Sequence, residues 1–317
     1  MKLRISAEDW EPFATELRLR KDVESAGIIL AEVKEGGEVL VARSCRTVPV
    51  DGYLVRKVDL LSIDPVVLNR LVRPARERRL AVVTVHTHPG TQEPWFSLAD
   101  DVGDSRLMPS LYVQTPGPHG SLVVAGETGR VGGRVWSPSG ARQPLEVHVV
   151  GGQLKMHLST PTSESQADGC FHRQELALGA MGQARLRHLH VVIVGLGGTG
   201  SVVLAQLAHL GVGRLTLIDG DVVEPANVSR IVGATLDDVG RPKVEVAARY
   251  VRALGLATKV ETLHGQLGIE VEPDQLGSGD VIFSCVDRHT PRSILNRLSY
   301  EMLIPVIDLG TALRVGT

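Results

Sequence analysis

The chain has 317 residues, of which 43% are hydrophobic and 22% charged, and its formal net charge at pH 7 is -2. This length suffices for two domains with separate cores, and so small a charge argues against a general nucleic-acid or membrane-surface binder. No apolar stretch reaches the ~18 residues that cross a bilayer, and the start, MKLRISAEDWEPF, lacks the apolar segment of a signal peptide. We therefore expect a cytoplasmic protein.

The first 158 residues are expected to form one domain, built from short strands with one or two helices between them. Asp64 and Pro65 are typical of a helix start, and β-branched apolar runs predict buried strands. The expected elements are a hairpin of 25–33 and 38–45 around two glycines, a helix over 64–79, and strands at 80–88, 110–116 and 120–127.

A linker is predicted at 159–169, because STPTSESQADG has no large apolar residue. From 170 to 317, strands and helices alternate, which predicts a Rossmann-like, doubly wound and mostly parallel sheet with helices on both faces. The α/β class is therefore expected for both domains. The expected strands are 190–195, 214–219, 259–264, 280–285 and 305–310, and the helices are 199–210, 242–254 and 291–302.

A metal-ligand pattern follows the strand that ends at His88. His86 and His88 are two residues apart in an extended segment, so their side chains point to the same side and can bind one ion. Asp100 follows in the first turn of a helix that Ser97 caps, and can supply an oxygen ligand. Two imidazoles and one carboxylate leave a fourth position open on zinc, as in catalytic zinc sites.

This stretch resembles the HxHPx7SxxD motif of the JAMM (MPN, Mov34, JAB) zinc metallopeptidases and matches it at every fixed position. The resemblance, which covers about 10–155, implies a Zn²⁺ site at His86, His88 and Asp100. It also implies that Glu24, just before the small and apolar run SAGIIL, is the catalytic acid/base, and that Ser97 donates to the oxyanion. JAMM enzymes cleave after the C-terminal glycine of ubiquitin-like proteins. Asp101 and His119 are expected at the surface.

A glycine-rich loop opens the second domain. Gly195, Gly197, Gly198 and Gly200 follow a buried strand and begin a helix, where free N–H groups bind phosphates. Asp219 ends the next strand, where a carboxylate can hold ribose hydroxyls. This pattern alone fits an NAD enzyme equally well.

The residues downstream distinguish the two classes. Asp219 and Asp221 are followed by Asn227 and Arg230, and then by Lys243. Fixed cations beside the nucleotide phosphates are needed where a carboxylate attacks an α-phosphate, because charge develops there. Asp287, at the end of the strand DVIFSCVD, is placed to hold Mg²⁺. The sequence therefore favours an adenylating enzyme over an NAD-linked oxidoreductase.

This set resembles the ThiF/MoeB family, related to ubiquitin-activating enzymes, with GxGGxG, DxDxVxxxNxxR, GxxK and CxD from about 170 to the end. The resemblance implies that Asn227, Arg230 and Lys243 contact the triphosphate of ATP. It implies that Asp287 binds Mg²⁺ and that Arg173, in a stretch often read YxRQ, reaches the ATP site across a homodimer.

The family usually continues past the last strand, into a region that often carries a thioester cysteine, so we expect the domain to be incomplete at its C-terminus. Cys45, Cys170 and Cys285 form no CxxC pair, and we expect reduced thiols, partly buried at Cys45 and Cys285. Adenylation follows from the motifs, whereas thioester transfer does not.

The combined resemblance implies a bacterial fusion that processes and activates a ubiquitin-like protein with a C-terminal glycine. We favour a conjugation system, in which a ubiquitin-conjugating-like enzyme is an expected partner and antiviral defence a possible use. One alternative is a sulfur-carrier pathway for a sulfur-containing metabolite or cofactor. Another is a JAMM peptidase with a non-catalytic nucleotide-binding module.

Overall fold

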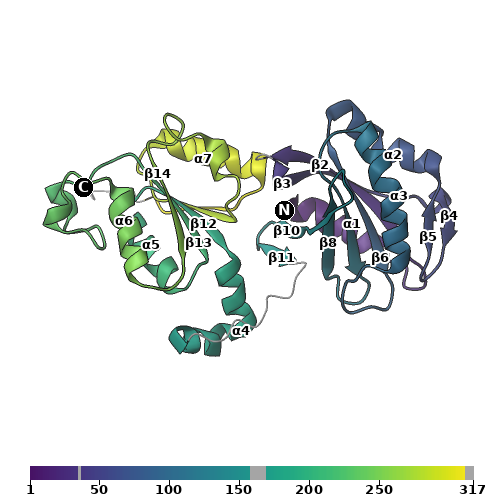
Figure 1. Cartoon of the computed structure of the whole chain (residues 1–317), viewed down its shortest axis with the longest axis horizontal. Coiled ribbons are helices and arrows are strands. Elements are labelled where there is room, and N and C mark those ends of the chain that lie inside the picture. Colours follow the sequence, from purple (N-terminus) through teal and green to yellow (C-terminus); the bar gives the residue numbers. More distant parts are fainter. Residues whose placement is uncertain (35–36, 158–168, 311–317) are drawn as a thin grey trace, which may run out of the picture. The chain divides into compact units, whose positions relative to one another are not determined.

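The computed structural model describes residues 1–34, 37–157 and 169–310 (Figure 1). The chain divides into two compact units, Met1–Pro161 and Thr162–Thr317. The linker expected at 159–169 lies, apart from Gly169, outside the described residues.

The N-terminal unit is built on a nine-stranded mixed sheet of order β11-β10-β1-β3-β2-β6-β7-β8-β9. Its strands are β1 (Lys2–Ser6), β2 (Ala26–Lys34), β3 (Val39–Thr47), β6 (Ala81–His88), β7 (His119–Ala125), β8 (Val131–Trp136), β9 (Arg142–Pro144), β10 (Glu146–Val150) and β11 (Lys155–His157). A separate two-stranded sheet joins β4 (Tyr53–Arg56) and β5 (Leu61–Ile63). The helices are α1 (Ala7–Leu17), α2 (Pro65–Arg78) and α3 (Leu98–Gln114).

Two hydrophobic cores form on the opposite faces of this sheet, because successive side chains of a strand point to opposite sides. On β2, Ile29 and Ala31 belong to the core under α1, whereas Ile28 and Leu30 belong to the core under α2 and α3. Figure 1 shows α2 and α3 next to each other on one face. The sheet is therefore covered on both sides.

The expected hairpin, the helix over 64–79 and the strands at 80–88 and 120–127 are confirmed. The strand expected at 110–116 is wrong, because these residues complete α3. Met108 and Leu111 are buried at helical spacing against the sheet, and this packing outweighs the β-preference of the Leu-Tyr-Val run. The expectation of one or two helices was also too low, since α1 adds a third.

The C-terminal unit contains a five-stranded parallel sheet of order β14-β13-β12-β15-β16. Its strands are β12 (His190–Val194), β13 (Arg214–Asp219), β14 (Lys259–His264), β15 (Val281–Ser284) and β16 (Val306–Asp308). Its helices are α4 (His172–His188), α5 (Gly198–His209), α6 (Lys243–Ala253) and α7 (His289–Met302). Every strand and helix that we expected from 190 onward is present.

The faces of this sheet are covered by different helices. Val191 and Ile193 of β12 pack with residues of α5 and α6, and Val192 and Val194 pack with residues of α7. The chain order reverses beside β12, from which β13 leads to one edge and β15 to the other. The doubly wound α/β class is confirmed, and ligands bind such sheets at this reversal point.

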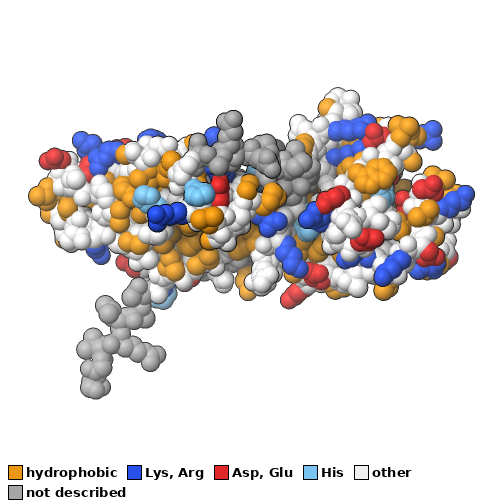
Figure 2. All heavy atoms as spheres, turned by 90° about the horizontal axis from the view of Figure 1, so that it is seen from below, with side chains coloured by type: hydrophobic (Ala, Val, Ile, Leu, Met, Phe, Trp, Pro, Cys, Tyr) orange, Lys and Arg blue, Asp and Glu red, His pale blue; other side chains and the backbone are white. Residues whose placement is uncertain are grey.

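One face of the N-terminal unit carries charges of both signs. Over the face of the N-terminal unit on the right of Figure 2, Lys and Arg side chains lie among Asp and Glu side chains. In the part of the chain that the structure describes, no helix combines the length and the apolar composition of a membrane span.

Candidate metal centre and nucleotide pocket

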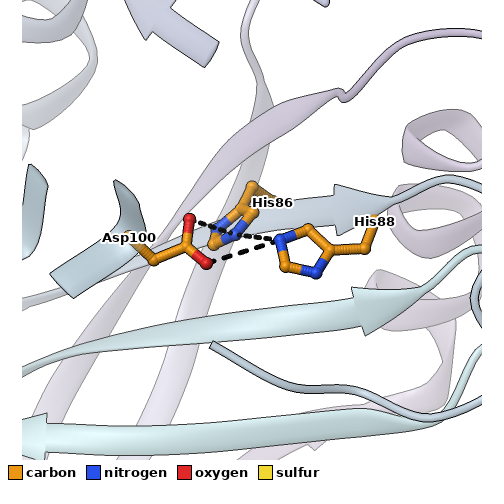
Figure 3. A group of neighbouring side chains, drawn as sticks. All are labelled: His86, His88 and Asp100. Atoms are coloured by element: carbon orange, nitrogen blue, oxygen red, sulfur yellow. Dashed lines mark hydrogen bonds and ion pairs between the residues drawn. The ribbon is translucent and has the colours of Figure 1, made fainter. Parts of the chain in front are cut away.

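Two histidines and one aspartate converge at the end of β6 (Figure 3). The Nε2 atoms of His86 and His88 lie 3.2 Å apart. Asp100, in the first turn of α3, places Oδ1 3.0 Å from Nε2 of His86 and Oδ2 3.4 Å from Nε2 of His88. The three predicted ligands are thus brought together from two elements.

These separations fit a divalent cation. In a tetrahedral zinc site with ligand distances of about 2.0–2.2 Å, neighbouring ligand atoms lie ~3.3–3.6 Å apart. His88 is almost fully buried, and its other ring nitrogen, Nδ1, has no hydrogen-bond partner among the described residues. Two imidazole nitrogens that face each other beside a carboxylate form the donor set of a catalytic zinc site.

Glu24 lies at the same place, two residues before the start of β2. Its Oε1 atom is 3.7 Å from Nε2 of His88, and its backbone is held by Arg56, whose Nε donates to the Glu24 carbonyl at 2.8 Å. Burial raises the pKa of Glu24 to about 7, although His86 and His88 act in the opposite direction. Asp100 differs: burial raises its pKa, but hydrogen bonds with the two histidines bring it well below its usual range.

Ser97 caps α3, as predicted. Its Oγ accepts from the backbone N–H of Asp100 at 3.1 Å and donates to Oδ2 of Asp100 at 2.8 Å. The backbone N–H of Ser97 donates to the same carboxylate oxygen at 2.6 Å. This reciprocal cap orients the Asp100 carboxylate, and the oxyanion role of Ser97 stays a prediction.

The expectation of surface positions fails for His119. Its side chain is completely buried on β7: Nδ1 accepts from the backbone N–H of Val82 at 3.0 Å, and Nε2 faces the Thr115 carbonyl at 3.0 Å. The two backbone partners satisfy the ring, so it can be buried without a metal. Asp101 is partly exposed and pairs with two arginines.

The glycine loop joins β12 to α5 in the C-terminal unit. Gly195 has a φ of +91°, which favours glycine. A Cβ atom on Gly200 would lie 1.8 Å from the carbonyl oxygen of Gly195, so Gly200 is required for close packing of helix against loop. Gly197 and Gly198 line a cavity of about 740 Å³ and begin the helix, where N–H groups are free for an anion.

The charged residues predicted for nucleotide binding line this cavity. They are Asp219, Asp221, Arg230, Lys243 and Asp287. Lys243 is almost buried, and its Nζ lies 2.8 Å from Oδ2 of Asp221. The Asp219 carboxylate accepts from the backbone N–H groups of Leu196, at 2.6 Å, and Asp221, at 2.8 Å.

Three predicted residues, Gly200, Asn227 and Arg173, lie outside the cavity lining. Asn227 is buried, and its Oδ1 accepts from the backbone N–H of Glu224 at 3.3 Å, so it shapes the turn that precedes Arg230. Arg173 is exposed at the start of α4, and its role across a dimer stays a prediction. Cys45 and Cys285 are free and partly buried, as expected, and Cys170 is exposed. Cys285 lines the cavity.

Comparison with protein families assigns both units. Residues 6–137 match the prokaryotic homologs of the JAB domain, and residues 171–316 match the ThiF family. The chain is a fusion of a JAB domain and a ThiF domain. This agrees with both resemblances found in the sequence.

Curated relatives match somewhat over two fifths of the chain. The SAMP-activating enzyme E1 of Haloferax volcanii is 37% identical over 130 residues, which are 41% of this chain and 48% of that protein. The sulfur carrier protein adenylyltransferase of Thermus thermophilus is 37% identical over 139 residues, 43% of this chain and 51% of its own length. Other relatives are matched over 28% of their length, so the chain spans about half, or less, of these proteins.

A solved structure similar to part of the chain is the Escherichia coli tRNA N6-threonylcarbamoyladenosine dehydratase in complex with ATP. It is 27% identical, has a TM-score of 0.42, and covers 46% of this chain and 60% of that chain.

Several site residues were missed from the sequence. In the JAB domain, Trp95 lies with its ring centroid 4.9 Å from that of His88, and Phe96 lies 6.5 Å from His86. Arg56 holds the backbone of Glu24. In the ThiF domain, Gln266 and Arg288 line the cavity. None of these residues belongs to a spaced motif, although an aromatic pair directly before the Ser97 cap is a signal that could have been noted.

Proposed function

We propose that the JAB domain is a zinc peptidase that cleaves after the C-terminal glycine of a small ubiquitin-like or sulfur-carrier protein, and that the ThiF domain adenylates the carboxylate thereby exposed. The observation that carries the proposal is the convergence of His86, His88 and Asp100, with Glu24 beside them. A structural metal site would use a fourth protein ligand, whereas among the described residues three ligand atoms converge, with the Glu24 carboxylate beside them.

His86, His88 and Asp100 would hold the zinc ion. When bound, zinc supplies Lewis acidity that polarises the scissile carbonyl and activates water. Glu24 takes the proton from the attacking water and gives it to the leaving amine. Its largely buried carboxylate lies beside His88, so it is close to the proposed ion. Ser97 keeps the Asp100 carboxylate aimed at the ion.

The ThiF cavity supports nucleotide activation. The first turn of α5 presents N–H groups to a phosphate, and Arg230 and Lys243 supply positive charge beside it. A terminal carboxylate oxygen attacks the α-phosphorus of ATP, the bond to the β-phosphate oxygen breaks, and pyrophosphate leaves. Asp287 would hold Mg²⁺, and Asp219 would accept hydrogen bonds from ribose hydroxyls. Lys243 pairs with Asp221, so its ammonium group must leave this carboxylate to pair with a phosphate when ATP binds.

The names of the relatives support this assignment of substrate class. The Haloferax protein is named a SAMP-activating enzyme E1, and the Thermus protein a sulfur carrier protein adenylyltransferase. A peptidase that exposes a terminal glycine and an enzyme that adenylates it act on the same chain end. The two activities are therefore consecutive steps on one partner.

The test uses the full chain and small ubiquitin-like proteins of the same genome that end in glycine, each with and without a short added tail. With zinc, mass spectrometry should find the tail removed after glycine. ATP–pyrophosphate exchange with MgATP should depend on the free terminal glycine. An intact tail would refute the peptidase, and exchange that is absent with every glycine-ending protein would leave the ThiF domain as a non-catalytic nucleotide-binding module.

The conjugation and sulfur-carrier versions share both steps and differ in the acceptor. In conjugation, the activated glycine forms an amide with a lysine of another protein, which gives a heavier conjugate. In sulfur transfer, the glycine carboxylate becomes a thiocarboxylate, which adds the mass difference between sulfur and oxygen. The mass of the processed partner recovered from cells separates the two.

A further inference from the structure

A buried arginine, Arg134, lies next to the residues that surround the candidate metal centre. Arg134 of β8 exposes only 9% of its side chain. Its Nε donates to Oδ2 of Asp104 and to Oγ of Ser121, both at 3.1 Å, and its Nη2 donates to Oδ2 of Asp104 at 2.6 Å. Its Nη1 donates to Oδ1 of Asp101. All three nitrogen atoms of the guanidinium are therefore engaged.

The same guanidinium contacts aromatic rings. Its central carbon, Cζ of Arg134, lies 3.8 Å from the ring centroid of Phe96 and 5.2 Å from that of Trp136. The Phe96 ring meets the His86 ring edge-on, with an angle of 66° between the planes. Arg134 thus reaches the imidazole of His86 through one intervening ring.

The residues that Arg134 contacts lie before and after Asp100 along the chain. Phe96 precedes the Ser97 cap, Asp101 follows Asp100 directly, and Asp104 lies one turn further along α3. Arg134 therefore fixes the chain before and after the aspartate ligand. It does so from β8, a strand that supplies no ligand.

Charge gives a second reason for this arrangement. Three carboxylates, Asp100, Asp101 and Asp104, lie within the first seven residues of α3, and they repel one another when desolvated. Arg134 pairs with Asp101 and Asp104. The oxygens of Asp100 are left to face His86 and His88.

We propose that Arg134 is a positioning residue of the metal centre: it holds Phe96 and the start of α3 so that His86 and Asp100 converge on one divalent cation. This inference rests on the proposed zinc site. Groups that orient metal ligands in this way typically contribute about 10- to 100-fold to metal affinity. A purely structural ion pair would change the stability of the domain without a specific change in metal affinity.

The experiment measures zinc affinity of the full chain by competition with a chromophoric chelator, and the visible spectrum of the cobalt-loaded protein. The variants are Arg134→Met and Arg134→Lys, since lysine keeps the charge but not the planar fork. The matched control is Arg142→Gln. Arg142 also pairs with Asp101, at 2.9 Å, and lies over Trp136, but it is 44% exposed. Thermal unfolding of the zinc-free proteins and circular dichroism report on the fold.

We expect zinc affinity to fall about 10- to 100-fold in Arg134→Met and by less in Arg134→Lys, with a changed cobalt spectrum, while Arg142→Gln stays within about twofold of the wild type. If Arg134→Met does not fold, Arg134→Lys decides. Folded Arg134 variants that bind zinc and cobalt as the wild type does would overturn the positioning role alone. A wild type that binds zinc no better than His86→Ala would overturn the proposed peptidase as well.

Discussion

Oε1 of Glu24 lies 3.7 Å from Nε2 of His88, although Glu24 precedes β2 and His88 ends β6. The antiparallel pairing of these strands, in which Ala26 lies opposite His86, brings the two side chains to the same edge of the sheet. The Arg56 side chain fixes the approach of the chain to that edge through the Glu24 carbonyl and the Ser25 hydroxyl. A carboxylate in this place can serve the chemistry of the ion without binding it.

Glu24→Gln should retain zinc and lose peptide cleavage. The amide preserves the shape of the side chain but cannot take up a proton, and general acid–base catalysis contributes about 10²- to 10⁴-fold. Cleavage of a glycine-ending precursor and zinc content are measured together. Asp22→Asn is the control, since Asp22 is exposed and pairs with Arg20. Undiminished cleavage by Glu24→Gln would remove Glu24 from the mechanism.

Lys243→Ala should lose adenylation and keep cleavage. The almost buried ammonium group is directed into the nucleotide cavity, and loss of one preorganised charge partner costs about 10²- to 10³-fold. Pyrophosphate exchange and tail removal are assayed on the same preparation. Lys259→Ala, at an exposed lysine of β14, should change neither activity. Equal loss of both activities in Lys243→Ala would contradict separate sites.

Gly200→Ala and Gly197→Ala should act differently. The added methyl at Gly200 would lie 1.8 Å from the Gly195 carbonyl oxygen, whereas at Gly197 it has no neighbour within 4 Å. Overpacking costs about 1–3 kcal/mol or more, so Gly200→Ala should lower the melting temperature. Gly197→Ala should keep the fold and weaken ATP binding, because Gly197 lines the cavity and the added methyl would take up open space there. Calorimetry and nucleotide titration check both, and unchanged stability of Gly200→Ala would contradict the packing argument.

Alkylation should separate the cysteines. Burial raises the pKa of Cys285 to about 11 and that of Cys45 to about 12, with smaller effects of Asp308 and Asp9. Both thiols are therefore protonated at pH 7.5, and their reaction with iodoacetamide should accelerate only as the pH approaches these values. Cys170 is exposed and should react first. Peptide mass spectrometry after timed labelling measures the order, and faster labelling of Cys285 at pH 7.5 would indicate an activated thiol instead.

Local sequence signals predicted most of the fold. Apolar and β-branched runs located β2, β3, β6 and β7, and the Asp64-Pro65 start located α2. The strand expected at 110–116 failed because Leu111, Tyr112 and Val113 have a strong β-preference, while the Ser97 cap and the burial of Met108 lie outside that window. The prediction of a surface position for His119 failed for a related reason. Its backbone partners come from other elements, and no local pattern predicts them.

The convergence of His86, His88 and Asp100 could be predicted because these residues follow a fixed spacing along one strand and one cap. The residues that orient them could not, since Arg134 meets Asp104 and Phe96 only through the arrangement of β8 against α3. The same holds for Arg56, which reaches Glu24 from the small β4–β5 sheet. Such contacts depend on tertiary packing, which single-sequence spacing does not encode.

X-ray absorption at the zinc edge of the full chain, loaded with one equivalent of zinc, tests the central claim most directly. We expect a spectrum with nitrogen and oxygen ligands at about 2.0–2.2 Å and no sulfur, and loss of the two-imidazole signal in His86→Ala. A sulfur ligand near ~2.3 Å, or a spectrum that is unchanged in His86→Ala, would contradict zinc binding by His86, His88 and Asp100.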